Sequence, residues 1–224
     1  MRRAPVYLLI DTSGSMAGES IIAVQNGIKT CIDTLRSDPE SLEKAHVSIV
    51  TFSDTASVAM PLTSVQEIPT VPDFTIHGCT SYVAALDKLN ELLEQDIVPN
   101  RGEEKGDYKA FVMIFTDGMP TDKESELQEA INRLNRKKIT YFVAGTTSSD
   151  ERVIPTLSKI TGKNEYVIFL SSADPRSFQR FFQWVSQSAS RSIGVQGDHR
   201  PGDDIPLGEL PPLPNFNPDD ELFL

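Results

Sequence analysis

The first residues along the chain that could form a binding or catalytic site are in the segment Asp11-Thr12-Ser13-Gly14-Ser15, which is rich in side chains with oxygen atoms. Asp11, Ser13 and Ser15 are spaced by two, and in an extended loop this spacing directs three oxygen donors to one side. Gly14 permits a tight backbone between them. One carboxylate and two hydroxyls form a hard-oxygen set, which suits Mg²⁺, Mn²⁺ or Ca²⁺ and is poor for zinc. The residue types therefore predict a divalent-cation site.

A second acid follows another apolar run in the same way. Asp11 ends the run Val6–Ile10, and Asp117 comes just after Phe111–Phe115. In a doubly wound sheet of order 3-2-1-4-5-6, strands 1 and 4 are neighbours, and ligands bind outside their carboxyl ends. Two acids in a partly dry cleft repel each other, and a divalent cation removes that conflict. We therefore expect Asp11 and Asp117 to meet at one site.

The strands that must position these acids are runs that are apolar on both faces, as in a parallel sheet covered by helices. Residues 56–62 alternate in polarity and follow residues 46–52 after a short link, which predicts an antiparallel edge strand. We predict an α/β, Rossmann-like fold with a central, mostly parallel six-stranded sheet flanked by helices on both faces. The predicted strands cover residues 6–10, 46–52, 56–62, 111–115, 141–144 and 166–170.

Helical spacing of apolar residues places helices between these strands. The first ends at Asp38-Pro39, and the sequence Thr121–Glu124 is typical of a capping box that opens a later helix. Pro155 suits the first turn of another helix, for which Gly162 is the stop. Phe178, Phe181 and Phe182 form an aromatic stripe on the last helix, which indicates core packing in preference to a cofactor site.

Size and charge exclude several classes of protein. The chain has 224 residues and a formal net charge of −11, and we predict one domain over residues 1–193. The acidic balance argues against a nucleic-acid or anionic-membrane surface, because phosphate binding needs clustered cations. No apolar run approaches the roughly 20 residues that cross a bilayer. With only Cys31 and Cys79 there is no disulfide framework, and we expect a cytoplasmic protein.

The composition changes sharply after Ile193. Residues 194–224 carry six prolines and seven acids against the single Arg200, which accounts for −6 of the −11 net charge. They predict an acidic, Pro-rich flexible tail. Residues 219–224 mix acids with apolar side chains. One hypothesis is that a tail acid occupies the metal site of its own or a neighbouring molecule, giving self-association; the alternative is a passive, solubilising linker.

Three elements taken together, in residues 11–15, 77–81 and 116–118, resemble the von Willebrand factor A domain and match its metal-ion-dependent adhesion site in order and context. The resemblance implies a cation whose open coordination position takes an Asp or Glu from a partner protein. Mg²⁺ fits best, because it takes six oxygens and keeps several waters. One departure is Cys79, where many members of the family have a second glycine. The implied metal ligands are the hydroxyls of Ser13, Ser15 and Thr80 and the carboxylates of Asp11 and Asp117.

Residues 8–19, 117–122 and 181–186 narrow the likeness to bacterial TerY-type proteins, which are associated with tellurium-resistance and related stress gene clusters. The likeness covers about residues 5–193 and leaves out the tail. It implies a non-catalytic adaptor in a stress-response complex. The implied partners are kinase-like or phosphatase-like proteins of the same gene cluster.

Other interpretations compete with this one. Asp11 and Asp117 could simply cap loops, and His77 with Cys79 could suggest zinc, although a zinc site needs about three or four protein ligands. The enzyme alternative is a Mg²⁺-dependent, phosphatase-like hydrolase that uses Asp11. That chemistry needs a second acid two residues further on, where this chain has Ser13. A hydroxyl cannot shuttle that proton near neutral pH, so we predict a protein without catalytic activity.

Overall fold

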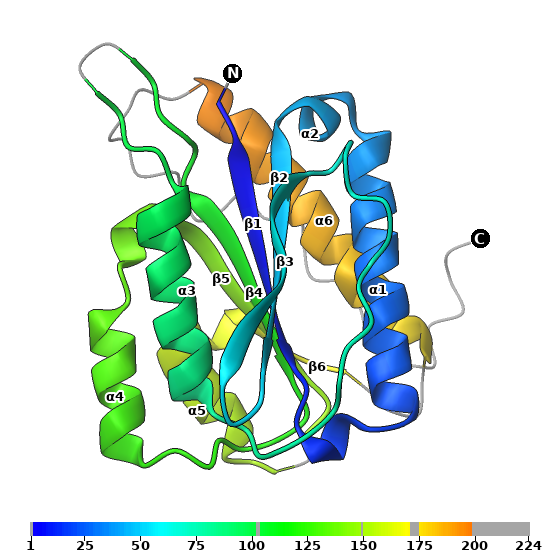
Figure 1. Ribbon diagram of the computed structural model, residues 1–224, viewed down its shortest axis with the longest axis vertical. Helices are drawn as coiled ribbons and strands as arrows, with labels where there is room; N and C mark the ends of the chain where they lie inside the picture. The colour runs from blue at the N-terminus through cyan, green and yellow to red at the C-terminus, as the bar shows by residue number, and fades with distance from the viewer. Residues whose placement is uncertain (1, 102–103, 149, 171–174, 199–224) are drawn as a thin grey trace.

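The computed structural model describes residues 2–101, 104–148, 150–170 and 175–198. Six strands form one sheet in the order β3-β2-β1-β4-β5-β6, which confirms the predicted topology. All neighbouring strands run parallel except β2 and β3, so β3 is the antiparallel edge strand (Figure 1). The strands are β1 (Ala4–Asp11), β2 (Ala45–Phe52), β3 (Ala56–Ser64), β4 (Ala110–Thr116), β5 (Ile139–Thr146) and β6 (Val167–Phe169).

Helices cover both faces of the sheet. Residues of α1 and α6 belong to one hydrophobic cluster, and residues of α3, α4 and α5 belong to the other. Short 3₁₀ turns lie at Gly14–Met16, Arg136–Lys138 and Asn164–Tyr166. Among the described residues, no helix is long and apolar enough to cross a membrane. The helices are α1 (Glu19–Ser37), α2 (Pro39–Lys44), α3 (Tyr82–Asp96), α4 (Glu124–Arg133), α5 (Val153–Thr161) and α6 (Pro175–Asp198).

The central strand β1 places the candidate site. Every residue of β1 is buried, and its side chains alternate between the two clusters, so both faces must be apolar. In the parallel register with β4, Ile10 pairs with Phe115. The next residues of the two strands are Asp11 and Thr116, and Asp117 follows. The register therefore brings the two strand-ending acids to one edge of the sheet.

The ends of two helices differ in detail from what the sequence indicates. Asp38-Pro39 does end α1, but Pro39 also begins α2, for which the Asp38 carboxylate accepts a hydrogen bond from the Ser41 backbone N–H at 2.8 Å. The last helix continues to Asp198, so residues 194–198 are helical, beyond the predicted domain limit at 193. The rest of the predicted tail, residues 199–224, lies outside the described residues.

The predicted capping box of α4 is wrong. The N-cap of α4 is Lys123, which makes no capping hydrogen bond through its side chain. Thr121 instead donates through its hydroxyl to the carbonyl oxygen of Thr80 at 3.0 Å. Asp122 accepts a 2.6 Å hydrogen bond from Ser81, the N-cap residue of α3. The polar side chains that precede α4 therefore serve the segment that contains Thr80.

A partly buried ion pair ties the start of β1 to the loop before β4. The side chain of Asp107 is only 5% exposed, and its Oδ2 lies 2.6 Å from Arg3 Nη2. It also accepts a hydrogen bond from the Val98 backbone N–H at 2.9 Å. Burial alone raises the pKa of Asp107, but the hydrogen bonds from Arg3 and Val98 and the Arg3 charge outweigh it, so its pKa falls below the ordinary 3.8.

We expect Asp107→Asn to lower the free energy of unfolding at pH 7 by roughly 1–3 kcal/mol, because it weakens a charge-assisted contact. A carboxyl with a depressed pKa stabilises the folded state above its unfolded pKa, and that stability is lost as pH falls through the folded value. The difference between native protein and variant should therefore shrink below about pH 4. Urea unfolding at pH 7 and pH 3 measures this, and an equal difference at both pH values would contradict it.

Candidate metal centre

Asp11 occupies the last position of β1 and is fully buried, at 0% exposure. Its Oδ1 accepts a hydrogen bond from the Ser13 backbone N–H at 2.8 Å. Its Oδ2 accepts one from the hydroxyl of Thr116, on β4, at 2.6 Å. Both carboxylate oxygens are thus held in fixed directions by the loop that follows β1 and by the neighbouring strand.

The two serines of the loop extend this network to the second acid. Ser13 Oγ lies 3.2 Å from Ser15 Oγ, and Ser15 donates to Asp117 Oδ1 at 2.8 Å. Four predicted ligands therefore lie together at the carboxyl edge of the sheet. Asp11, Ser13, Ser15 and Asp117 come from the ends of two adjacent parallel strands, which is where open α/β sheets bind ligands.

Thr80, the fifth predicted ligand, lies in a segment that is attached to both loops. The Gly78 carbonyl accepts from the Gly14 N–H at 3.1 Å, and the Thr80 carbonyl accepts from the Thr121 N–H at 2.8 Å. Thr80 itself is 6% exposed. These backbone contacts bring the Thr80 segment to the same edge, between the loop after β1 and the loop after β4.

The path of this segment depends on a glycine. Gly78 has φ 73°, a conformation that is strained for a larger residue, and a Cβ there would lie 1.9 Å from Asp54 Oδ2, so a substitution would also displace the Asp54 side chain. Asp54 in turn accepts a hydrogen bond from the Cys79 N–H at 3.0 Å. Cys79 does not have a positive φ and is exposed. The departure from a second glycine is therefore accommodated without backbone strain.

Sequence reasoning missed two residues that organise the site. Thr116 orients Asp11, and the Tyr82 hydroxyl donates to the Gly118 carbonyl at 2.5 Å, which ties α3 to the loop after Asp117. Thr116 stands in the Thr116–Gly118 element, but its contact with Asp11 follows from the register of β4 against β1, which no local pattern of residues specifies. The contact of Tyr82 carries no signal in the sequence either.

The electrostatics of the two acids favour a bound cation. Burial raises the pKa of Asp11, and the Asp117 charge adds to this, while hydrogen bonds from Thr116 and Ser13 partly offset it. Burial also raises the pKa of Asp117, partly offset by Ser15. Within the described part of the chain, neither acid forms an ion pair with a basic side chain. A divalent ion would supply the missing positive charge.

The donor set is made entirely of oxygen atoms. Over the residues that are described, no group of three or more His, Cys, Asp or Glu could hold a metal ion, so a cation here would rely on hydroxyls and waters beside two carboxylates. That chemistry fits Mg²⁺. His77 contacts Ser53 Oγ through Nδ1 at 3.1 Å, and Cys79 is exposed. Cys31 is fully buried, which raises the pKa of its thiol to about 12, as expected of a small core residue.

The chain also matches a family of known proteins. The model of the von Willebrand factor type A domain matches residues 6–184. A search of curated proteins gives no match.

Solved structures share the fold at low sequence identity. A von Willebrand factor type A protein from Catenulispora acidiphila has a TM-score of 0.61 and 19% identity over 86% of this chain and 43% of its own. The pilus adhesin SpaC from Lactobacillus rhamnosus GG, in an open conformation, has a TM-score of 0.64 and 13% identity over 86% of this chain and 30% of its own. Proximal thread matrix protein 1 from the mussel byssus, "with zinc occupied MIDAS motif", has a TM-score of 0.55 and 18% identity over 83% of this chain and 46% of its own. The present chain thus spans less than half the length of each.

Proposed function

Because the chain belongs to the von Willebrand factor type A family, we propose that it is a metal-dependent protein-binding module. In this proposal one divalent cation takes an Asp or Glu side chain from a partner protein into its coordination shell. Such a contact is charge-assisted and lies in a partly desolvated cleft, where it is stronger than in water. The residues proposed to hold the cation are Asp11, Ser13, Ser15, Thr80 and Asp117.

One observation carries the proposal: two carboxylates with raised pKa values lie in one hydrogen-bonded network without a compensating cation from the described side chains. Asp11 and Asp117 would balance the charge of the ion. Ser13, Ser15 and Thr80 would supply neutral oxygens. Ser15 is exposed, so a partner's carboxylate can approach from its side of the loop.

Mg²⁺ is the proposed ion, and Mn²⁺ or Ca²⁺ would suit the same donors. The mussel protein named above has zinc in its MIDAS motif, so zinc belongs in any comparison of ions. An oxygen-only set without Cys or His favours a hard cation over zinc.

We further propose that binding proceeds without catalytic turnover. The position two residues after Asp11, where phosphatase chemistry needs an acid, holds Ser13, and the Ser13 hydroxyl lies against Ser15. A serine hydroxyl is not a proton shuttle near neutral pH.

The likeness to TerY-type proteins supports a more specific proposal, that the module is a cytoplasmic adaptor in a tellurium-resistance or related stress complex. Kinase-like and phosphatase-like proteins of the same gene cluster are the partners to test first, by co-purification with and without chelator.

The metal itself gives the direct test. Titration of Mg²⁺ into chelator-treated protein should show one binding site. A ligand that binds only the folded state adds about 2.7 kcal/mol to the free energy of unfolding at a concentration 100 times Kd. It therefore also raises the melting temperature. Isothermal titration calorimetry and thermal unfolding measure the two effects. The same melting temperature with 10 mM MgCl₂ and with chelator would contradict the proposal.

A further inference from the structure

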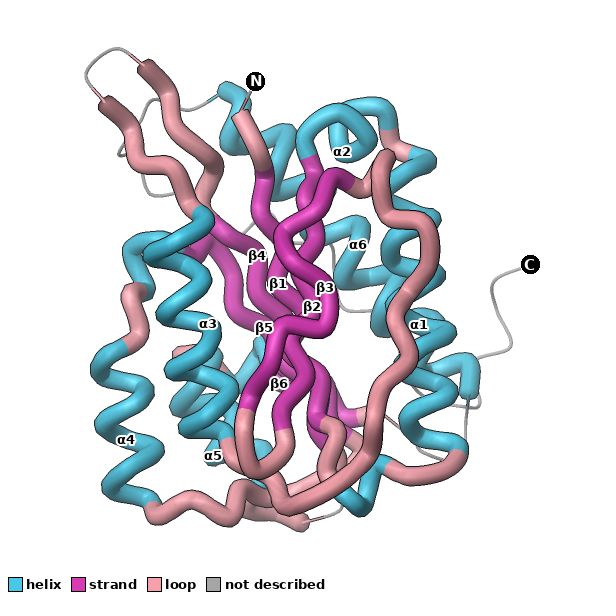
Figure 2. Tube along the Cα trace, viewed as in Figure 1, coloured by secondary structure: helices cyan, strands magenta, loops and turns pink. Residues whose placement is uncertain are grey.

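A second polar cavity lies beside the metal loop. It has a volume of about 400 Å³ and is lined on one side by residues of β2, of β3 and of the turn between them, and on the other by residues of the segment 73–77. Figure 2 shows the connection that contains these residues running down between β3 and α1. The lining residues are mostly hydroxyl-bearing, and they include Thr12, Thr51, Ser53, Thr55, Ser57 and Thr75.

The hydroxyls of this cavity, which we term the hydroxyl pocket, are partly paired and partly free. Ser53 Oγ lies 3.1 Å from His77 Nδ1, which fixes one wall. The side chains of Thr55 and Thr75 are exposed and make no side-chain hydrogen bond within the described residues. Each hydroxyl offers one donor and two acceptor sites. The pocket can therefore both donate to a ligand and accept from it.

The charges of the lining narrow the chemistry of that ligand. No Lys or Arg is among the described residues that line the pocket; its ionisable side chains are Asp73 and His77, and the His77 ring contacts Ser53. An oxoanion would meet the Asp73 carboxylate without a fixed cation to bind it. An apolar group would remove water from the hydroxyls without replacing their hydrogen bonds, which is costly. A neutral group with both donors and acceptors fits best.

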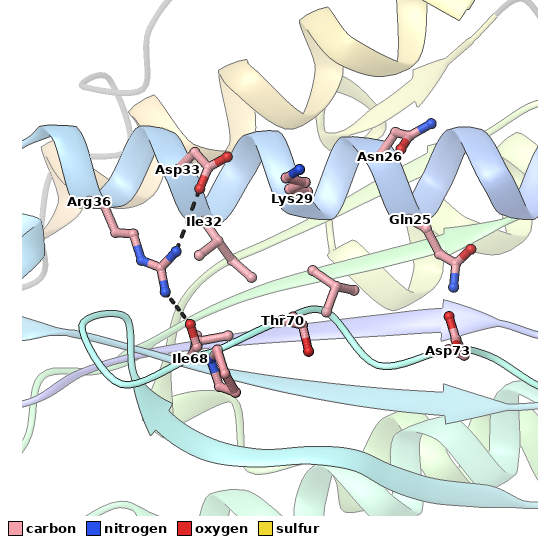
Figure 3. A pocket seen from close by; sticks show the side chains of 11 residues that line it. Gln25, Asn26, Lys29, Ile32, Asp33, Arg36, Ile68, Thr70 and Asp73 are labelled. Carbon is pink, nitrogen blue, oxygen red and sulfur yellow. Dashed lines mark hydrogen bonds and ion pairs between the residues drawn. The ribbon is translucent and has the colours of Figure 1, made fainter.

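The outer wall of the pocket is held from behind by α1. Arg36 Nε donates to the Val65 carbonyl at 2.7 Å, and its Nη2 donates to the Ile68 carbonyl. Figure 3 shows Arg36 reaching across to Ile68, and Gln25 pointing from α1 toward Asp73. The groove on this side, between α1 and residues 68–73, has a volume of about 390 Å³. The Arg36 contacts anchor the connection at residues 65 and 68, and Gln25 Nε2 donates to the Pro72 carbonyl at 3.5 Å, next to Asp73 of the pocket wall. A wall anchored before a ligand arrives reduces the entropic cost of binding.

The hydroxyl pocket is continuous with the metal loop. Thr12, which lines it, stands between Asp11 and Ser13, and its carbonyl accepts from the His77 N–H at 2.9 Å. The pocket and the metal loop therefore share Thr12, so a partner segment that extends past the metal edge can reach both.

We propose that the hydroxyl pocket binds an Asn, Gln, Ser or Thr side chain of the partner, in the same chain segment as the acid that the metal holds. This inference rests on the proposed function. The proposal predicts a sequence pattern in the partner's binding segment: an acidic residue and a neutral polar residue that are separated by a fixed number of positions.

An array of peptides with one fixed acid, X-X-X-Asp-X-X-X, tests the signature with Mg²⁺-loaded protein. We expect enrichment of Asn, Gln, Ser or Thr at one offset from the Asp. The double variant Thr55→Val, Thr75→Val should bind the selected peptide roughly tenfold more weakly and lose the offset preference, because it removes two hydroxyls without changing side-chain shape. Its Mg²⁺ affinity without peptide should stay unchanged.

The matched control is Thr30→Val with Thr63→Val, which removes two hydroxyls that bond to backbone carbonyls elsewhere. It should keep the preference of the native protein. Peptide binding that needs Mg²⁺ and the Asp but shows no preference at any offset, or a preference that survives Thr55→Val with Thr75→Val, overturns the pocket assignment alone. No Mg²⁺-dependent binding of any peptide contradicts the proposed function, and this inference with it.

Discussion

Replacing Asp11 by asparagine is expected to abolish Mg²⁺ binding and to leave the metal-free protein folded. Asparagine can keep both contacts of Asp11, because its carbonyl oxygen can accept from the Ser13 N–H and its amide can donate to Thr116. It cannot supply the negative charge. Loss of an outer-sphere partner already costs about 10–100-fold in metal affinity, so loss of this ligand should cost at least roughly 100-fold. Isothermal titration calorimetry measures the loss.

The stability of the metal-free protein should not fall when Asp11 is replaced by asparagine, although metal affinity does. The raised pKa of Asp11 means that the folded state favours the protonated form, and that this contribution is lost as pH rises through the folded pKa. Above the folded pKa of Asp11 the metal-free native protein therefore bears the cost of a buried charge. Asp11→Asn removes that cost and should unfold at the same urea concentration or a higher one.

Two further variants separate charge from contact. Asp11→Ala loses the hydrogen bonds as well as the charge, and it should abolish both metal binding and partner binding. Asp33→Asn changes an exposed acid on α1 and should leave Mg²⁺ affinity unchanged. Undiminished Mg²⁺ affinity or partner affinity in the Asp11 variants would refute the metal site.

The second large effect concerns the contact between α1 and α6. Gly27 lies inside α1, and a Cβ at this position would lie 2.1 Å from Cδ2 of Phe182, a fully buried side chain of α6. Alanine is favoured over glycine in a helix by about 1 kcal/mol. Overpacking a close-packed core outweighs this gain, so we expect Gly27→Ala to destabilise the protein by roughly 1–3 kcal/mol. Thermal and urea unfolding measure the change.

The neighbouring residue provides the control. Asn26→Ala changes an exposed position of the same helix turn and should have almost no effect or stabilise slightly. Phe182→Leu combined with Gly27→Ala should cost less than the sum of the two single changes, because the smaller side chain relieves the overlap. A Gly27→Ala variant as stable as the native protein would show that the two helices separate easily.

Much of the fold was predictable, since each parallel strand is an apolar run and the alternation in residues 56–62 marks the edge strand β3. The missed features depend on which partner a polar residue finds. Asp122 satisfies the N-terminus of α3, so the cap predicted for α4 does not form. Pro39 both ends one helix and begins another, because proline is equally suited to the first turn.

The candidate site likewise contains residues that the sequence predicts and residues that it does not. Topology alone predicts that Asp11 and Asp117 lie close together, because strands 1 and 4 are adjacent at the point where the winding reverses. Thr80 follows only from the family resemblance. The role of Thr116 requires the register of β1 against β4, which no local pattern of residues specifies.

The hydrogen bond between Thr116 and Asp11 joins residues 105 positions apart. Contacts of such sequence separation form late in folding, since long stretches of chain must first be brought together. No fragment that stops before β4 can assemble these donors. Binding of an ion at the candidate metal site would then require that the whole sheet has formed. Release of the ion would be coupled to global unfolding more closely than to local unfolding of any one loop.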